Sequence, residues 1–193
     1  MKTAWLFGQS SNFSKQIISE LKNQHYDTTG FGRSNVDYSD FDTFIKGKQA
    51  PNVLILNANV EEKISLIIDI FNYNDVKLKD LDEMFLAYTP IFLFFVKLLK
   101  WIESKNKTDS VCSISSSITQ HPQIENKYIM YAVLRSMLQQ VVFSASNSVS
   151  NAFCVSPNYI DTNNSESYAK AVVELLSNKL VNRKIINLNE YIR

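Results

Sequence analysis

The stretch AWLFGQSSNFSKQIISEL, residues 4–21, decides the fold because it contains a buried strand, a tight turn and a helix in succession. An unbroken apolar run comes first, and the isoleucines and leucines after the turn fall on one helical face. Gly8 is the one glycine of the turn. Glycine permits a positive φ and lets a diphosphate approach the backbone. We interpret this segment as a phosphate-binding unit that has lost most of its glycines.

Strand-like and helical patterns alternate along the rest of the chain. Further strands are expected at residues 25–30, 52–58, 110–116, 150–157 and 183–188, and helices at 40–47, about 126–145, 166–178 and along a segment through Leu93. Such alternation indicates right-handed βαβ crossovers. The sequence therefore predicts a single Rossmann-type α/β domain over residues 1–193, with a doubly wound parallel sheet and helices on both faces.

The composition argues against two classes of partner. The 193 residues carry 20 basic and 19 acidic side chains, a net charge of +1, so we expect neither a nucleic-acid nor a membrane partner. The most apolar segment, residues 90–102, contains Lys97 and Lys100 and is shorter than the roughly 20 apolar residues of a membrane span. It predicts a buried or interface helix. The first residues lack a secretory pattern, and we expect a cytoplasmic protein.

The cysteines and histidines do not form a metal-binding pattern. Cys112 and Cys154 lie inside strand-like apolar runs, and the sequence has no CxxC or Cys/His cluster. His25 and His121 are isolated in predicted loops. We therefore expect two buried thiols in a reducing compartment and no metal site.

Polar residues that follow the predicted strands are the candidates for a ligand site. In a doubly wound sheet, ligands bind at the carboxyl ends of the strands, beside the point where the strand order reverses. Four segments qualify, residues 8–14, 57–59, 115–117 and 157–162.

The most informative pattern is a strand that ends in serines, followed by a helix with Tyr131 and Arg135 four residues apart. Residues at this spacing share one helix face. A phenol, whose ordinary pKa is roughly 10, is a poor acid or base at neutral pH, and a cation one turn away favours its phenolate. A serine hydroxyl from the strand end can then orient a carbonyl or alcohol oxygen against the tyrosine.

These motifs together resemble the short-chain dehydrogenase/reductase family, in the right order over nearly the whole chain. FGQSSNFS resembles the family's TGxxxGxG turn, LNANV its NNAG segment, and YAVLR its YxxxK motif. VSPNYIDT resembles the segment whose threonine lies against the nicotinamide. The resemblance implies hydride transfer between a nicotinamide cofactor and a small-molecule carbonyl or alcohol substrate.

The resemblance also assigns roles to residues. Tyr131 would be the acid/base, Ser116 would orient the substrate oxygen, with Ser117 the close second choice, and Arg135 would stand in the lysine's place. The cofactor-binding residues would be Gly8, Ser10, Ser11, Asn12, Phe13, Arg33, Ser34, Asp37, Asn57, Ala58, Asn59, Pro157, Ile160 and Thr162.

The segment after the second predicted strand decides the expected cofactor. Arg33 and Ser34 stand near the place where an NAD-binding member carries an acidic residue, and they can accept a 2′-phosphate, so NADP is preferred over NAD. Asp37 resembles the family's acidic residue beside the adenine.

Several positions depart from the family pattern. Asn12, Asn59 and Asn158 replace glycines, and because asparagine tolerates a positive φ we expect them to preserve that conformation. Ser14 replaces a third glycine.

Other departures concern catalysis and assembly. Leu86 stands near the family's relay asparagine, and a guanidinium such as that of Arg135 does not readily pass a proton. The segment after Thr162 is too short for a substrate lid. The alternative function is therefore a catalytically impaired or inactive nucleotide-binding or structural relative. Because the family often packs the two long helices across a two-fold axis, we expect a homodimer or homotetramer.

Overall fold

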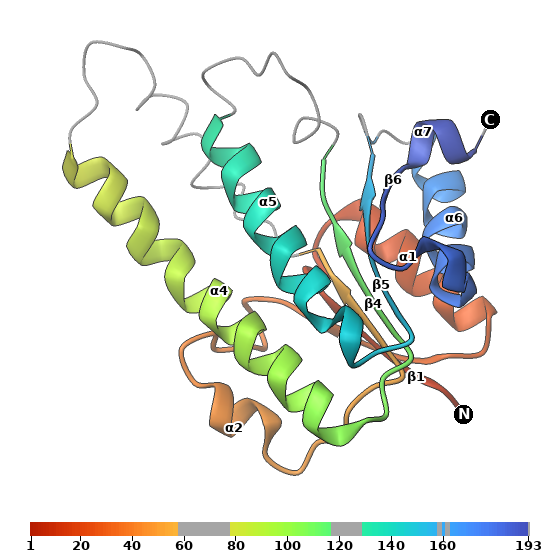
Figure 1. Ribbon diagram of the computed structural model, residues 1–193, viewed down its shortest axis with the longest axis horizontal. Helices are drawn as coiled ribbons and strands as arrows, with labels where there is room; N and C mark the ends of the chain where they lie inside the picture. The colour runs from red at the N-terminus through yellow and green to blue at the C-terminus, as the bar shows by residue number, and fades with distance from the viewer. Residues whose placement is uncertain (58–77, 117–128, 158–159, 161–162, 193) are drawn as a thin grey trace.

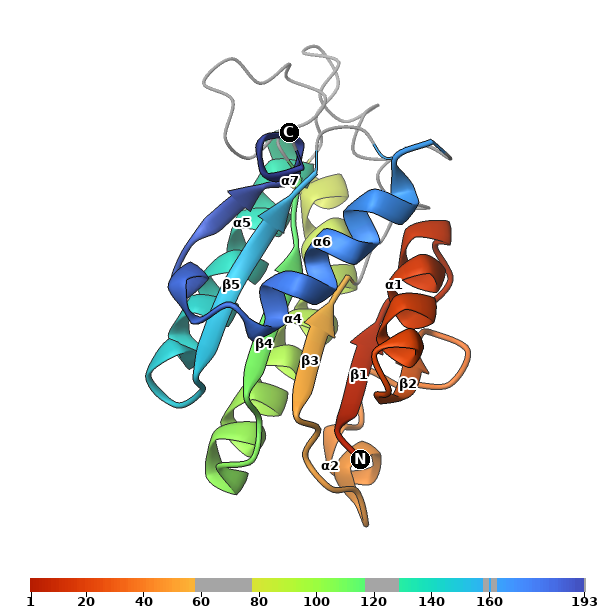
Figure 2. The same ribbon diagram turned by 90° about the vertical axis from the view of Figure 1, so that its right-hand side faces the viewer.

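The computed structural model describes residues 1–57, 78–116, 129–157, 160 and 163–192. Six parallel strands form one sheet in the order β2-β1-β3-β4-β5-β6 (Figures 1 and 2). The strands are β1 (Thr3–Phe7), β2 (Asp27–Phe31), β3 (Val53–Leu56), β4 (Ser110–Ile114), β5 (Asn151–Ser156) and β6 (Ile185–Asn187). The predicted parallel α/β sheet is confirmed.

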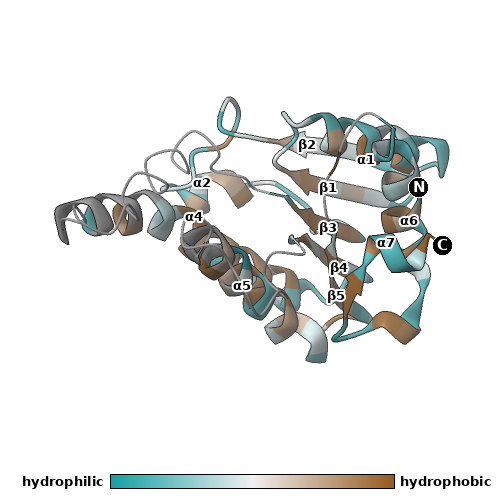
Figure 3. Ribbon diagram, turned by 90° about the horizontal axis from the view of Figure 1, so that it is seen from above, coloured by the Kyte–Doolittle hydropathy of each residue, from teal (hydrophilic) through white to brown (hydrophobic). Residues whose placement is uncertain are grey.

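Helices lie on both faces of this sheet. They are α1 (Asn12–Asn23), α2 (Phe41–Ile45), α4 (Leu78–Lys105), α5 (Ile129–Ser144), α6 (Ser165–Ser177) and α7 (Leu188–Tyr191), with short 3₁₀ helices η3 (Ala145–Asn147) and η4 (Lys179–Val181). Helices α4 and α5 cover one face, and α1 and α6 cover the other (Figures 1 and 3). Among the described residues, no helix is both long and apolar enough to cross a bilayer.

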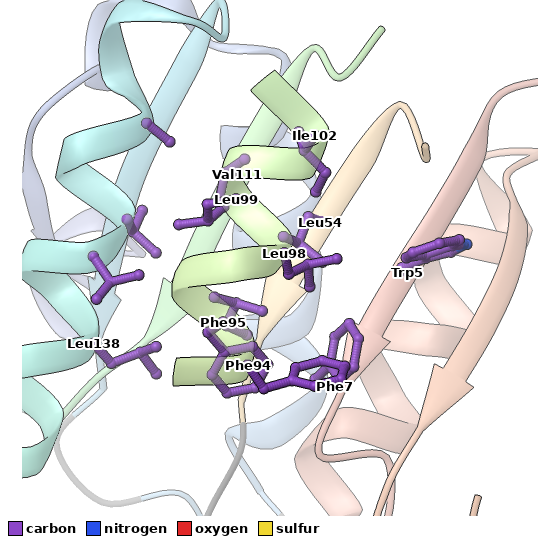
Figure 4. Close-up of a cluster of buried hydrophobic side chains, with 14 of the residues drawn as sticks. Trp5, Phe7, Leu54, Phe94, Phe95, Leu98, Leu99, Ile102, Val111 and Leu138 are labelled. Atoms are coloured by element: carbon purple, nitrogen blue, oxygen red, sulfur yellow. The ribbon is translucent and has the colours of Figure 1, made fainter. Parts of the chain in front are cut away.

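The core consists of two layers because neighbouring residues of a strand point to opposite faces of the sheet. Trp5 and Phe7 of β1 face α4, whereas Ala4 and Leu6 face α1 and α6. The layer under α4 is rich in aromatic rings, and Figure 4 shows Phe94 beside Phe7. The predicted role of this apolar stretch of α4 as a buried helix is therefore confirmed for the side chains that face the sheet.

The two cysteines lie on opposite faces of the sheet. Ser113 of β4 is the register partner of Cys154 on β5, so Cys112 points the other way. Both thiols are buried and free, as predicted. The hydroxyl of Ser113 contacts the sulfur of Cys154 at 2.9 Å.

The sheet has one strand fewer on its β2 side than the usual dinucleotide-binding order 3-2-1-4-5-6. Residues 32–52, all of them described, form α2 and turns but no strand. Strand β2 is therefore the edge of the sheet. The point where the strand order reverses lies between β1 and β3.

Candidate active site

The turn after β1 is closed by hydrogen bonds to the end of β2. Gly8 has a φ of 91°, which a residue with a Cβ adopts only at a cost. The amides of Gly8 and Gln9 both donate to the carbonyl of Phe31, at 2.8 and 3.1 Å. The retained glycine therefore stands at the position that needs a positive φ.

The expectation of a positive φ at Asn12 was wrong. Among the described non-glycine residues, positive φ values occur at His25, Asn106 and Arg183 only, and Asn12 is the first residue of α1. Ser11 caps this helix by accepting from the amide of Ser14 at 3.1 Å, so the helical conformation has already begun at Asn12. Asn59 and Asn158 lie outside the described residues.

Asn57 joins β3 to the start of α1. Its side-chain nitrogen donates to the hydroxyl of Ser14 at 2.8 Å, with a longer contact of 3.4 Å to that of Ser11. The side chain of Ser14 is fully buried. The position of the third glycine therefore holds a hydroxyl whose hydrogen bonds fix the helix against the neighbouring strand. Ala58 and Asn59 lie outside the described part of the chain.

The first turn of α1 can receive an anion. The first amide groups of a helix have no acceptors within the helix. In α1, the amide of Ser14 donates to the hydroxyl of Ser11. Within the described residues, the amides of Asn12 and Phe13 have no acceptor. The side chains of Ser10 and Asn12 are exposed, whereas Phe13 is buried and offers only its backbone. Helix N-termini of this kind bind phosphate groups, so the turn fits the diphosphate of a dinucleotide.

Arg33 and Ser34 lie exposed in the turn that follows β2. Asn35 holds this turn because its side chain accepts from the amide of Gly32 at 2.7 Å and donates to the carbonyl of Gly30 at 3.2 Å. Burial raises the pKa of Tyr38 to about 12, against an opposing effect of the charge of Arg33.

Asp37 is engaged by its own turn. The hydroxyl and the amide of Ser39 donate to one carboxylate oxygen of Asp37 at 2.6 and 2.8 Å, and the hydroxyl contact most strongly holds the pKa of that carboxyl below its usual range. Its expected contact with an adenine stays a prediction.

The carboxyl end of β4 is fastened to α5 by two polar side chains one turn apart. Arg135 is 7% exposed, and its guanidinium donates to the carbonyl of Ile114 at 2.9 Å. The buried amide of Gln139 donates to the hydroxyl of Ser115 at 2.5 Å. Ser116, the next residue along the chain, is half-buried. The predicted Arg135 and Ser116 therefore lie at the same strand end.

Tyr131 lies on α5 one helical turn before Arg135, as its spacing predicted. Its side chain and all of Ser117 lie outside the described part of the structure. Sequence reasoning missed Gln139, although it continues the four-residue spacing of Tyr131 and Arg135 along α5. That periodicity was the available signal.

The remaining predicted residues lie at the ends of β5 and on α4. Pro157 is buried directly after β5, and Ile160 packs against the core under α6, while Thr162 lies outside the described residues. The hydroxyl of Ser156 is fully buried and has no hydrogen-bond partner among the described residues. Leu86 is 72% exposed on α4, and its hydrocarbon side chain has no group that could hold a relay water.

Comparisons with known proteins found similarity in structure and not in sequence. No family model and no curated protein sequence matches the chain. A short-chain dehydrogenase/reductase from Saccharomyces cerevisiae matches in structure with a TM-score of 0.70 at 16% identity, over 98% of this chain and 96% of that one. ElxO with NADP bound matches with a TM-score of 0.68 at 14% identity, over 97% of both chains.

A third solved structure is also similar in fold and low in sequence identity. A small-chain dehydrogenase in complex with NADPH has a TM-score of 0.68 and 12% identity, and the match covers 96% of this chain and 95% of that chain. The chain therefore has the fold of the short-chain dehydrogenases/reductases.

Proposed function

We propose that this chain is an oxidoreductase that transfers a hydride between NADP and a small-molecule carbonyl or alcohol. The observation that carries the proposal is that two groups of candidate site residues lie at the carboxyl ends of strands of the same parallel sheet. The N-terminus of α1, whose first two amides lack acceptors among the described residues, follows β1. Ser116 follows β4, and the guanidinium of Arg135 also reaches that strand end. A dinucleotide that crosses the point of strand reversal would connect these two places.

The chain's own residues would hold the cofactor as follows. The amides of Asn12 and Phe13 would bind the diphosphate, with the exposed Ser10 beside them. Arg33 and Ser34 would bind the 2′-phosphate of the adenosine ribose, because the turn directly after β2 presents the cation of Arg33 there. When bound, NADPH supplies the hydride. Two of the similar structures hold NADP or NADPH, which supports this choice.

The proton of the proposed reaction would come from Tyr131. Its phenol would protonate the carbonyl oxygen as the hydride reaches the carbon, and the hydroxyl of Ser116 would hold that oxygen. Arg135, one turn from Tyr131 on α5, would favour the phenolate that this transfer leaves. A guanidinium keeps its own proton, so reprotonation of Tyr131 would proceed through solvent.

We also propose that two copies associate through the outer face of α4 and α5. Among the described side chains of these helices, the large apolar ones that are exposed are Phe85, Leu86, Leu93 and Val133. Apolar side chains gathered on one face mark an interaction site in many soluble proteins. A second copy would bury the same face on both partners, as two-fold symmetry requires.

The function is tested by titrating NADPH and NADH into the purified protein and following cofactor fluorescence or heat. We expect NADPH to bind with a Kd on the order of micromolar, several-fold or more below that of NADH. Arg33→Ala should remove this preference, whereas Lys22→Ala, which deletes an exposed cation at the far end of α1, should leave it unchanged. Absence of binding of both cofactors at millimolar concentration would overturn the oxidoreductase proposal.

A further inference from the structure

The side chain of Gln9 lies across two glycines at the end of β2. A Cβ on Gly30 would stand 2.4 Å from Oε1 of Gln9 and 3.0 Å from its Cβ, and a Cβ on Gly32 would stand 3.5 Å from its Cγ. Neither glycine has a positive φ, since Gly8 and Gly47 are the described glycines that do. The space that Gly30 leaves is therefore occupied by the side chain of Gln9, which a Cβ at this position would displace.

The backbone fixes where this side chain lies. Gln9 follows Gly8 in the turn after β1, and its amide donates to the carbonyl of Phe31 on β2 at 3.1 Å. The side chain thus extends from the phosphate-binding turn over the end of β2. In dinucleotide-binding folds, the adenosine ribose lies between these two places.

The carboxamide of Gln9 is free to bind a ligand. Within the described residues, it makes no hydrogen bond, although the side chain is half-buried. A carboxamide is neutral and presents both a donor and an acceptor. A carboxylate at the same place would accept from a ribose 2′-hydroxyl and repel a 2′-phosphate.

We propose that Gln9 is a specificity-determining residue that contacts the 2′-substituent of the adenosine ribose. The inference rests on the proposed function. The amide group donates to the 2′-phosphate, and because it is neutral it adds no negative charge beside Arg33. The side chain of Gln9 packs against Gly30 and Gly32, and this packing holds the carboxamide in position. Preference for NADP thus depends on the turn after β1 as well as on the turn after β2.

The test is Gln9→Glu, which keeps the length of the side chain and adds one negative charge. Adenosine 2′,5′-bisphosphate and 5′-AMP probe the adenosine end alone, and NADPH and NADH probe the whole site. We expect binding of both 2′-phosphorylated probes to weaken about tenfold or more, less so at high salt, while 5′-AMP and NADH bind as well or better. Gln16→Glu, an exposed position on α1 with the same change in charge, should alter each Kd less than twofold.

A second pair of variants tests whether the packing of Gln9 against Gly30 matters for cofactor binding. Gly30→Ala should displace the carboxamide and weaken NADPH binding as much as Gln9→Ala does. The double variant should add little, because both changes act through the same contact. Circular dichroism confirms that each variant is folded.

The outcomes separate the two proposals. If the wild-type protein binds NADPH and Gln9→Glu changes the ratio of NADPH to NADH affinity by less than twofold, the role of Gln9 is refuted and the oxidoreductase proposal stands. If the wild-type protein binds none of the four probes, both are refuted.

Discussion

At the scale of single residues, Asn57 is the clearest case of a predicted ligand-binding residue that the fold itself uses. Its side-chain amide reaches two serines of α1, and Ser14 is fully buried. Asn57→Ala should lower the free energy of unfolding by about 1–3 kcal/mol, because a buried hydrogen-bonding group loses its partner. Urea denaturation measures this. The matched control is Asn23→Ala at the exposed end of α1, where we expect a change within about 0.5 kcal/mol. Equal losses at the two positions would contradict the structural role.

The buried thiols and one phenol predict sensitivity to alkali. Burial raises the pKa of Cys154 from 9.0 to about 12 and that of Tyr38 from 10.0 to about 12, and it also raises the pKa of Cys112. In this range the unfolded chain has released protons that the folded chain still binds. These groups therefore add no pH dependence well below pH 9, and the free energy of unfolding falls as pH rises above it.

The measurement for this prediction is urea unfolding from neutral pH to about pH 10.5. Replacement of one thiol by Cys154→Ala should make the decline with pH shallower, whatever it does to stability at neutral pH. A decline of the same slope in both proteins would show that other groups cause it.

At the scale of elements, α4 is held to the sheet by the ring of Phe94. This ring is 1% exposed and contacts Phe7 of β1 and Phe44 of α2, with centroid separations of 5.8 and 5.1 Å. Phe94→Ala should cost about 3–5 kcal/mol of unfolding free energy because it leaves a cavity between three elements. Phe92→Ala on the same helix, where the ring is only half-buried, should cost about 1–2 kcal/mol. Similar losses at the two positions would refute the anchoring role of Phe94.

The elements were predictable because strand and helix periodicity is local. The apolar run at residues 52–58 predicted the strand found as β3 (Val53–Leu56), and the helix expected at about 126–145 is found as α5 (Ile129–Ser144). Contacts between distant segments were not predictable, because no short pattern encodes them. Gln9 meets Gly30, and Gln139 meets Ser115, only after the strands have aligned. The conformation of Asn12 was mispredicted because its serine cap starts the helix earlier than the glycine pattern implied.

At the scale of the whole molecule, the exposed apolar face of α4 and α5 predicts self-association. Leu86→Glu combined with Leu93→Glu should convert a dimer into a monomer, because a charge buried in an apolar interface is costly. Sedimentation velocity distinguishes the two states. Leu180→Glu, at an 80% exposed leucine on η4, is the control and should not change the sedimentation coefficient. A wild-type protein that sediments as a monomer would refute this interface.

The placement of the two cysteines has a consequence for the covalent state of the chain. They lie on opposite faces of the sheet, each sealed within its own core layer, so they cannot meet in a disulfide without breaking β4 from β5. Oxidants and alkylating reagents reach them only after unfolding. We therefore expect that Cys112 and Cys154 do not form a disulfide with each other in the folded chain, whatever the redox potential around it.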